Sequence, residues 1–174
     1  MDTSVANAHL ENAQRAADIA YMRCALEQAR QAAALGEVPI GAVVVFEERV
    51  IAHGCNRRET DADPSAHAEH IALLAAARTL GRWRLSGCTI YVTLEPCLMC
   101  AGLMQQARID RCVFATHDPK GGALGSLYQV HADKRLNHRF AVESGICEQE
   151  SAELLRAFFA NLRRRKEGDD EHSH

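Results

Sequence analysis

Side chains that bind zinc well occur in two short motifs of this sequence. The first motif is His67-Ala68-Glu69, and the second is Cys97-Leu98-Met99-Cys100. Because residues three apart on a helix share a face, both thiolates of the second motif can bind one ion at Zn–S distances of about 2.3 Å. One imidazole and two thiolates leave the fourth position of a tetrahedral zinc to water, as in catalytic sites. The sequence therefore predicts a catalytic zinc held by His67, Cys97 and Cys100.

Glu69 is the predicted proton carrier beside this zinc. The pattern H-x-E followed by P-C-x-x-C is the signature of zinc deaminases that act on nucleobases, and Pro96 completes it here. A zinc-bound water, whose pKa falls toward ~7, can attack an amidine carbon. A neighbouring carboxyl moves the water's proton first to a ring nitrogen and then to the leaving amine. The predicted reaction is hydrolytic deamination with release of ammonia.

Simpler interpretations of the same residues stay open at this point. A cysteine pair is often two buried apolar side chains or a redox pair, and a lone histidine is often a satisfied core residue. Glu69 alone could be a carboxylate on a helix surface. A structural zinc would need a fourth protein ligand, and the nearest candidate is His70. We expect His70 to be a neighbour rather than a ligand, because it points about a third of a turn away from Glu69.

Length, cysteine use and hydropathy limit the class of protein. A chain of 174 residues suffices for one domain with a sizeable core. Its seven cysteines are odd in number and irregularly spaced, which argues against a disulfide-stapled secreted scaffold. No signal-peptide pattern opens the chain, and no apolar run approaches the ~20 residues that span a bilayer. We expect a cytoplasmic protein without membrane contact, with one zinc-dependent deaminase domain over residues 1–168 and a disordered tail over 169–174.

The charge distribution bears on binding of nucleic acid. A net charge of −3 argues against indiscriminate electrostatic binding, which normally needs a basic surplus. A basic run nevertheless extends from Arg163 to Lys166. It could be a solvated helix end, where cations suit the helix dipole, or it could contact RNA phosphates.

Apolar patterns predict the elements that carry the motifs. Helical spacing predicts a helix over residues 15–35, after a frayed start over 1–14, and another over 146–166. β-branched and apolar runs predict strands, of which the last is the shortest, over residues 38–46, 50–53, 88–94, 112–116 and 140–142. This order of elements predicts an α/β fold in three layers, with a central mixed sheet flanked by helices on both faces.

Two further helices should position the motifs themselves. Asp63-Pro64 predicts a helix start, because Asp can cap free N–H groups and Pro suits the first helical position. That helix would run to Leu80 and hold His67 and Glu69 in its first turns. Glu95-Pro96 predicts the start of the second helix, whose first turn would hold both cysteines.

The two motifs lie within longer segments, at residues 56–57, 63–69, 91–102, 125–127 and 137–139. These segments closely resemble the bacterial tRNA-specific adenosine deaminases, a family of the cytidine deaminase-like superfamily. The likeness extends from about Ala16 to Lys166, with departures at Cys55 and in the loop of residues 57–62. The resemblance implies a cytidine deaminase-like fold, one Zn2+ per subunit and a homodimer. The implied substrate is the anticodon stem-loop of tRNA, whose wobble adenosine at position 34 becomes inosine.

The resemblance also implies residues for substrate binding. Asn56 matches the family asparagine that hydrogen-bonds the target base, and Asp118 matches a position near the sugar of the flipped nucleotide. Lys120 lies beside Asp118, and His138 belongs to the segment at 137–139. Taken alone, Asn56 and Asp118-Pro119 could equally be ordinary turn residues, and His138 could brace a loop.

Two rival functions share parts of this pattern. A deaminase of a free nucleobase or nucleoside, such as guanine or cytosine, would use the same four motif residues, so the motifs do not separate it from an RNA-editing enzyme. A non-catalytic RNA-binding or scaffold protein with a structural zinc would have no use for Glu69 over an open coordination position.

Overall fold

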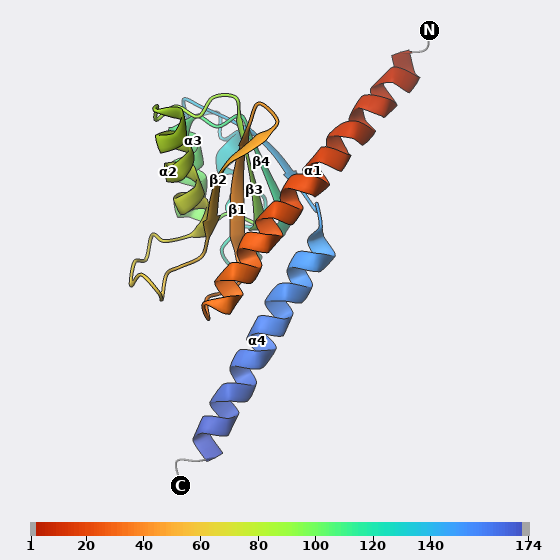
Figure 1. The fold of residues 1–174 in the computed structure, drawn as a ribbon. Helices are drawn as coiled ribbons and strands as arrows, with labels where there is room; N and C mark the ends of the chain where they lie inside the picture. The colour runs from red at the N-terminus through yellow and green to blue at the C-terminus, as the bar shows by residue number, and fades with distance from the viewer. Residues whose placement is uncertain (1–2, 172–174) are drawn as a thin grey trace.

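The computed structural model describes residues 3–171, and the side chains of residues 7–165. It contains a central sheet and four α-helices, arranged as the ribbon in Figure 1 shows. In chain order the elements are α1 (Thr3–Ala34), β1 (Gly41–Phe46), β2 (Arg49–Cys55), α2 (Ala68–Leu80), β3 (Cys88–Leu94), α3 (Leu98–Ala107), β4 (Arg111–Thr116), a 3-10 turn η1 (Val130–Ala132), β5 (Ala141–Ser144) and α4 (Glu148–Glu171).

The sheet has five strands in the order β2-β1-β3-β4-β5. β1 pairs antiparallel with both β2 and β3, while β3, β4 and β5 run parallel to one another. The sheet is therefore mixed, as predicted. The parallel strands require crossover connections, and α3 supplies the one between β3 and β4.

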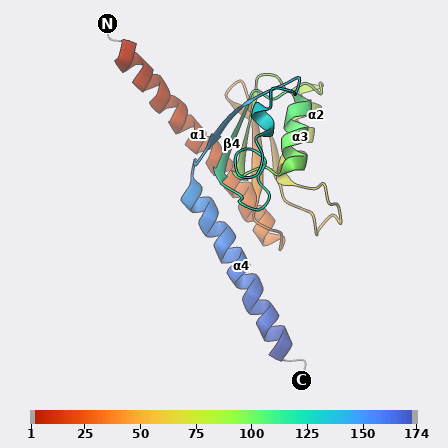
Figure 2. The same ribbon diagram turned by 180° about the vertical axis from the view of Figure 1, so that it is seen from behind.

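The two faces of the sheet bury different helices because successive residues of a strand point to opposite sides. In β1, Ala42 and Val44 belong to the core shared with α2 and α3, whereas Val43 and Val45 pack in the cluster beneath α1. Figures 1 and 2 show α2 and α3 on one side of the sheet and α1 and α4 on the other. The predicted three-layer α/β/α architecture is confirmed.

Close contact between β2 and α2 fixes where the first motif lies. A Cβ atom on Gly54 would be 2.2 Å from the carbonyl oxygen of Ala68 and 2.8 Å from the amide nitrogen of Ala72. Only glycine allows the start of α2 to approach the strand this closely. The helix start that follows His67 is thus pressed against the sheet.

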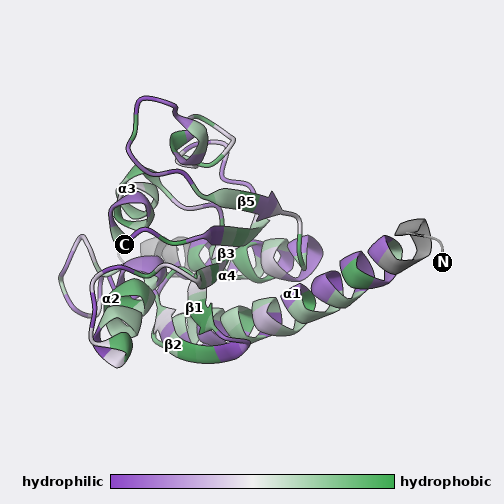
Figure 3. Ribbon diagram, turned by 90° about the horizontal axis from the view of Figure 1, so that it is seen from above, coloured by the Kyte–Doolittle hydropathy of each residue, from purple (hydrophilic) through white to green (hydrophobic). Residues whose placement is uncertain are grey.

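Three helix boundaries differ by more than two residues from those predicted. α3 also begins slightly later than predicted, at Leu98, so Cys97 is its N-cap residue instead of lying in its first turn. α1 begins at Thr3, so the prediction of a frayed start was wrong for residues 3–14. Residues 7–16 of this helix are exposed, and Figure 3 shows its N-terminal end projecting beyond the sheet. Exposed turns carry no apolar stripe, so the periodicity on which the prediction rested could not reveal them.

The second difference concerns the start of α2, which is Ala68 instead of the predicted Asp63-Pro64. Asp63 Oδ1 accepts hydrogen bonds from the backbone N and the Oγ of Ser65, both at 2.7 Å. Its side chain therefore stabilises a local turn, and the helix begins five residues later.

The third difference is at the C-terminal end. α4 continues to Glu171, three residues into the segment predicted to be a tail, and residues 172–174 lie outside the described residues. None of the described helices combines the length and hydropathy needed to cross a membrane.

Candidate active site

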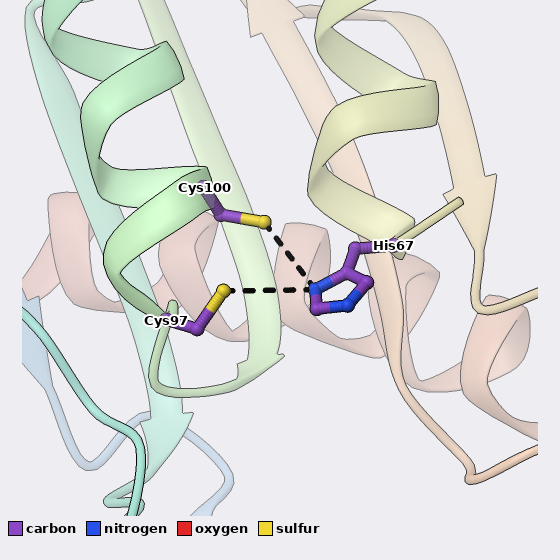
Figure 4. A group of neighbouring side chains, drawn as sticks. All are labelled: His67, Cys97 and Cys100. Atoms are coloured by element: carbon purple, nitrogen blue, oxygen red, sulfur yellow. Dashed lines mark hydrogen bonds between the residues drawn. The ribbon is translucent and has the colours of Figure 1, made fainter. Parts of the chain in front are cut away.

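His67, Cys97 and Cys100 come together between the starts of α2 and α3. The Nδ1 atom of His67 lies 3.7 Å from Cys97 Sγ and 3.6 Å from Cys100 Sγ, and Figure 4 shows the three side chains directed at one another. They form a group of metal-type donors within 4.8 Å of each other. The structure thus brings together all three residues predicted as zinc ligands.

Helix starts present two of these side chains. His67 is the N-cap residue of α2 and Cys97 that of α3, both with extended backbone and neither using its side chain as a cap. Neither side chain is therefore taken up by helix capping, and both contribute to the donor group. Cys100 lies one turn into α3, on the same face as Cys97, as their spacing predicted.

The donor set fits a zinc ion. Tetrahedral geometry with Zn–N of about 2.0–2.1 Å and Zn–S of about 2.3 Å requires N···S separations of about 3.5–3.6 Å, close to those found here. Hydrogen bonding from Cys100, then from His67, lowers the pKa of Cys97 to about 3. The same contact with Cys97, together with burial, raises the pKa of Cys100. Among the described side chains no fourth donor joins the group, which is the arrangement of catalytic rather than structural zinc.

Glu69 lies beside Cys100 without belonging to the donor group. The carboxyl group is buried, with 4% of the residue exposed, and this burial raises its pKa to about 7. A carboxyl close to balance between its protonated and ionised forms suits general acid–base work near neutral pH. His70, the residue considered as a fourth ligand, instead directs Nδ1 to the backbone oxygen of Ser65 at 2.8 Å.

A cavity of about 200 Å³ opens onto these groups. Its walls come from the segment before β1, the end of β2, the start of α2, the end of β3 and the loop after β4. The lining residues are Val38, Ile40, Asn56, Arg58, His67, Ala68, Glu69, Leu94, Glu95, Cys97 and Asp118. Five predicted site residues from separate parts of the sequence therefore line one cavity: Asn56, His67, Glu69, Cys97 and Asp118.

The carboxylate of Glu37 fixes the orientation of the Asn56 amide. Sequence analysis did not identify Glu37 as part of the site. Asn56 Nδ2 donates to Glu37 Oε2 and to the backbone oxygen of Val38, both at 3.4 Å. The amide oxygen of Asn56 makes no hydrogen bond within the described part of the chain, so it is available to a ligand. Glu37 Oε1 also accepts from Thr60, from its N at 2.6 Å and its Oγ1 at 2.8 Å. Glu37 thereby links Asn56 to the loop before α2.

A second buried carboxylate, Glu95, underlies the loop that carries Asp118. It accepts hydrogen bonds from the backbone N atoms of Asp118, Leu124 and Ser126 at 2.9–3.0 Å. Burial tends to raise the pKa of Glu95, but the bonds from Ser126, Asp118 and Leu124 outweigh it and hold the pKa below the ordinary value. The position of Glu95 directly before Pro96-Cys97 was the sequence signal that could have identified it.

Two other residues predicted to bind substrate lie outside this cavity. Lys120 is exposed, and its backbone N donates to Asp118 Oδ1 at 3.0 Å. His138 Nε2 lies 2.7 Å from the backbone oxygen of Ile109, near the far end of α3. Their contact with substrate stays a prediction.

Comparison with known proteins agrees with this geometry. The family model of the MafB19-like deaminases matches residues 16–163. The tRNA-specific adenosine deaminase of Bacillus subtilis is 46% identical over 149 residues, which cover 86% of this chain and 92% of that protein.

Solved structures give the same result for the fold. A structure from work on A-to-I editing by tRNA:A34 deaminases superposes with a TM-score of 0.75 and 46% identity, covering 78% of this chain and 98% of that one. Guanine deaminase from Nitrosomonas europaea superposes with a TM-score of 0.69 at 28% identity, over 82% of this chain and 84% of that one. The site, the family match and the extent of the likeness together show that this chain belongs to the tRNA-specific adenosine deaminase family.

Proposed function

We propose that this protein hydrolyses the 6-amino group of adenosine at position 34, the wobble position of tRNA, yielding inosine and ammonia. The observation that supports this most directly is the donor group of His67, Cys97 and Cys100, which borders the cavity that the buried Glu69 also lines. Relatives at 39–46% identity over more than four fifths of the chain are named tRNA-specific adenosine deaminases.

The residues of the cavity have distinct roles in this reaction. His67 Nδ1 and the two cysteine sulfurs would hold a zinc ion, one per chain, which when bound activates water for attack on an electrophilic carbon. The Glu69 carboxylate accepts one proton as water adds to the carbon that bears the amine, and passes it to the neighbouring ring nitrogen. It then accepts the proton of the hydroxyl formed on that carbon and passes it to the amine, which leaves as ammonia when the C–N bond breaks and the carbonyl forms. The free amide oxygen of Asn56 can accept a hydrogen bond from the base and orient it.

A free nucleobase such as guanine is the alternative substrate, because guanine deaminase shares this fold. The proposal favours tRNA because identity to the tRNA-editing structure is 46% over 78% of this chain. Identity to guanine deaminase is 28% for the Nitrosomonas europaea enzyme and 35%, over only 56% of this chain, for the Bacillus subtilis enzyme. Arg58 on the cavity wall gives an anionic nucleic acid a positive partner beside the site. The exposed arginines Arg163, Arg164 and Arg165 of α4 could contact phosphates further away.

The active form is proposed to be a homodimer with the anticodon stem-loop bound beside the site of each chain. Large apolar side chains are exposed on α2, just after it and at the start of α3, namely Leu74, Trp83, Leu98 and Met99. Leu74 and Trp83 line an apolar groove of about 470 Å³ there, and Leu98 and Met99 lie between the two cysteines. Burying such a patch against a second copy would stabilise a dimer close to the site.

The deciding experiment measures inosine in an anticodon stem-loop with adenosine at position 34, by nucleoside analysis after incubation with the zinc-loaded protein. Free adenosine, guanine and cytosine are assayed in parallel for ammonia release. We expect inosine in the RNA, lost in Glu69→Gln while the zinc content stays at one per chain. The exposed Glu27→Gln serves as the matched control, with activity unchanged. Release of ammonia from guanine, without inosine in the RNA, would show that the protein is a free-nucleobase deaminase instead.

A further inference from the structure

The loop over residues 117–126 is assembled around one buried side chain. Glu95 is 2% exposed, and each of its carboxylate oxygens accepts several hydrogen bonds from this loop. Oε1 accepts from the backbone N of Leu124 at 3.0 Å and of Ser126 at 2.9 Å. Oε2 accepts from the backbone N of Asp118 at 3.0 Å and from the Oγ of Ser126, and His117 Nδ1 lies 3.3 Å away.

The same loop is joined to the zinc-ligand segment by its backbone. The N of Ala123 donates to the oxygen of Pro96 at 2.8 Å, and Gly122 forms an isolated β-bridge with Cys97. Glu95 itself is tied to the sheet, because its N donates to the oxygen of Thr116 at 2.8 Å. The loop therefore rests on the residues that precede the first cysteine.

Gly122 shows how closely the loop fits the carboxylate. A Cβ at this position would lie 2.2 Å from Glu95 Cδ, and its three nearest atoms would all belong to that carboxyl group. The backbone of Gly122 is not in the left-handed region, so the conflict with Glu95 is what excludes a side chain here.

We propose that Glu95 is a positioning residue for the nucleotide substrate, which holds the 117–126 loop so that Asp118 forms a wall of the cavity. This rests on the proposed function, since it assigns Glu95 to substrate binding in that same cavity. Glu95 acts through the loop and not on the zinc ligands, which are fixed by the starts of α2 and α3.

A carboxylate is needed because every partner is a donor. In Glu95→Gln an NH2 group replaces one oxygen, and in either amide orientation it would face at least one backbone N–H of the loop. Buried donors left without acceptors are costly, so the loop should leave its position. The substitution removes no zinc ligand and changes side-chain volume little.

The first test follows the loop by amide hydrogen exchange of the zinc-loaded protein without substrate. In Glu95→Gln we expect the amides of Asp118, Leu124 and Ser126 to exchange at least about tenfold faster, while those of α2 and α3 are unchanged. Zinc stays at one per chain. The matched control Glu27→Gln, on the exposed face of α1, leaves exchange in the loop unchanged.

Gly122→Ala is a second variant, which keeps Glu95 but places a methyl group against its carboxylate from the loop side. It should accelerate exchange of the same amides, and it should have no further effect in a Glu95→Ala background, where its clash partner is gone. With the adenosine-34 stem-loop, Glu95→Gln and Gly122→Ala should each raise KM about tenfold or more and change kcat less.

Two results would overturn the assignment. One is unchanged exchange in the loop and unchanged KM in both variants. The other is parallel loss of zinc and of kcat, which would make Glu95 a support of the metal site. Because exchange and zinc content require no substrate, they decide the role of Glu95 in the loop even if the wild-type protein fails to edit the stem-loop.

Discussion

At the scale of single residues, three buried glutamates in or next to the cavity differ in their surroundings. Glu37 and Glu95 accept several hydrogen bonds each, so they are bound to fixed partners. Glu69 lies in a setting where burial dominates and raises its pKa to about 7. The same type of side chain is therefore held as an anchor where several donors bind it, whereas in the proposed reaction it would carry protons where burial dominates.

Loss of either thiolate should abolish zinc binding. Cys97→Ser and Cys100→Ser each leave two donors of the predicted set, and a serine hydroxyl is a poor zinc ligand at neutral pH. We expect zinc content, measured by atomic absorption after dialysis, to fall from one per chain to less than about a tenth of that. Cys24→Ser, at an exposed position of α1, is the control. Full zinc occupancy in either variant would refute the ligand assignment.

Glu37→Gln should weaken substrate binding through Asn56. The substitution disturbs the acceptors that fix the Asn56 amide and the N and Oγ1 of Thr60. We expect kcat/KM for the stem-loop to fall about tenfold, in line with the loss of one hydrogen bond to a charged group, with unchanged zinc content. An unchanged kcat/KM would show that Asn56 is oriented without Glu37.

The sequence was sufficient to predict the compact part of the site but not its supports. His67, Glu69, Cys97 and Cys100 carry chemistry in short motifs, and their spacing alone indicates a common ligand. Glu37 and Glu95 act on partners that are 19–31 residues away in the chain. Their roles depend on which loops the fold places next to them, and no local sequence pattern indicates these contacts.

At the scale of elements, α1 is attached to the sheet by a buried carboxylate. Asp18 is 1% exposed and accepts from Tyr91 OH at 2.7 Å, and from Arg111 Nη1 at 2.8 Å and Nη2 at 2.7 Å. Tyr91 is on β3 and Arg111 on β4, so a single residue of the helix bridges two neighbouring strands.

Asp18→Asn should destabilise the fold in a pH-dependent way. Burial tends to raise the pKa of Asp18, but hydrogen bonds from Arg111, Tyr91 and Gln14 outweigh it and lower the pKa below 3.8. The stabilisation is therefore fully present above about pH 4 and lost as pH falls through the lowered value.

We expect urea unfolding at pH 7 to show Asp18→Asn less stable by about 2–3 kcal/mol, with the difference from wild type shrinking below pH 4. A constant difference down to pH 3 would contradict the ionic origin of the effect.

Helices and strands were predictable where burial of one face gives apolar residues a regular spacing in the sequence. The apolar runs predicted all five strands but not all of their bounds, because β1 begins at Gly41 instead of residue 38 and β2 extends to Cys55 instead of residue 53. Helix starts were less predictable. Asp63 has the chemistry of a helix cap but uses it in a turn with Ser65, and the start of α2 depends instead on the contact at Gly54.

At the scale of the whole molecule, the face formed by α2 and α3 is the proposed contact with a second copy. Trp83 is 59% exposed there. We expect Trp83→Glu to convert the dimer to a monomer in sedimentation velocity at micromolar concentration, because a charge would be buried in the apolar groove. Leu10→Glu, on the projecting part of α1, leaves the dimer intact. A wild-type protein that sediments as a monomer would remove the basis for this interface.

The position of the proposed zinc ligands at two helix starts has a consequence for folding. An ion bound to His67 and to Cys97, which are 30 residues apart, would act as a covalent cross-link does, by closing a chain loop that the unfolded protein leaves open. Cross-links of comparable span contribute roughly 3–4 kcal/mol. Zinc supply would then govern how much folded protein survives, so that scarcity of the metal would lower enzyme abundance as well as activity.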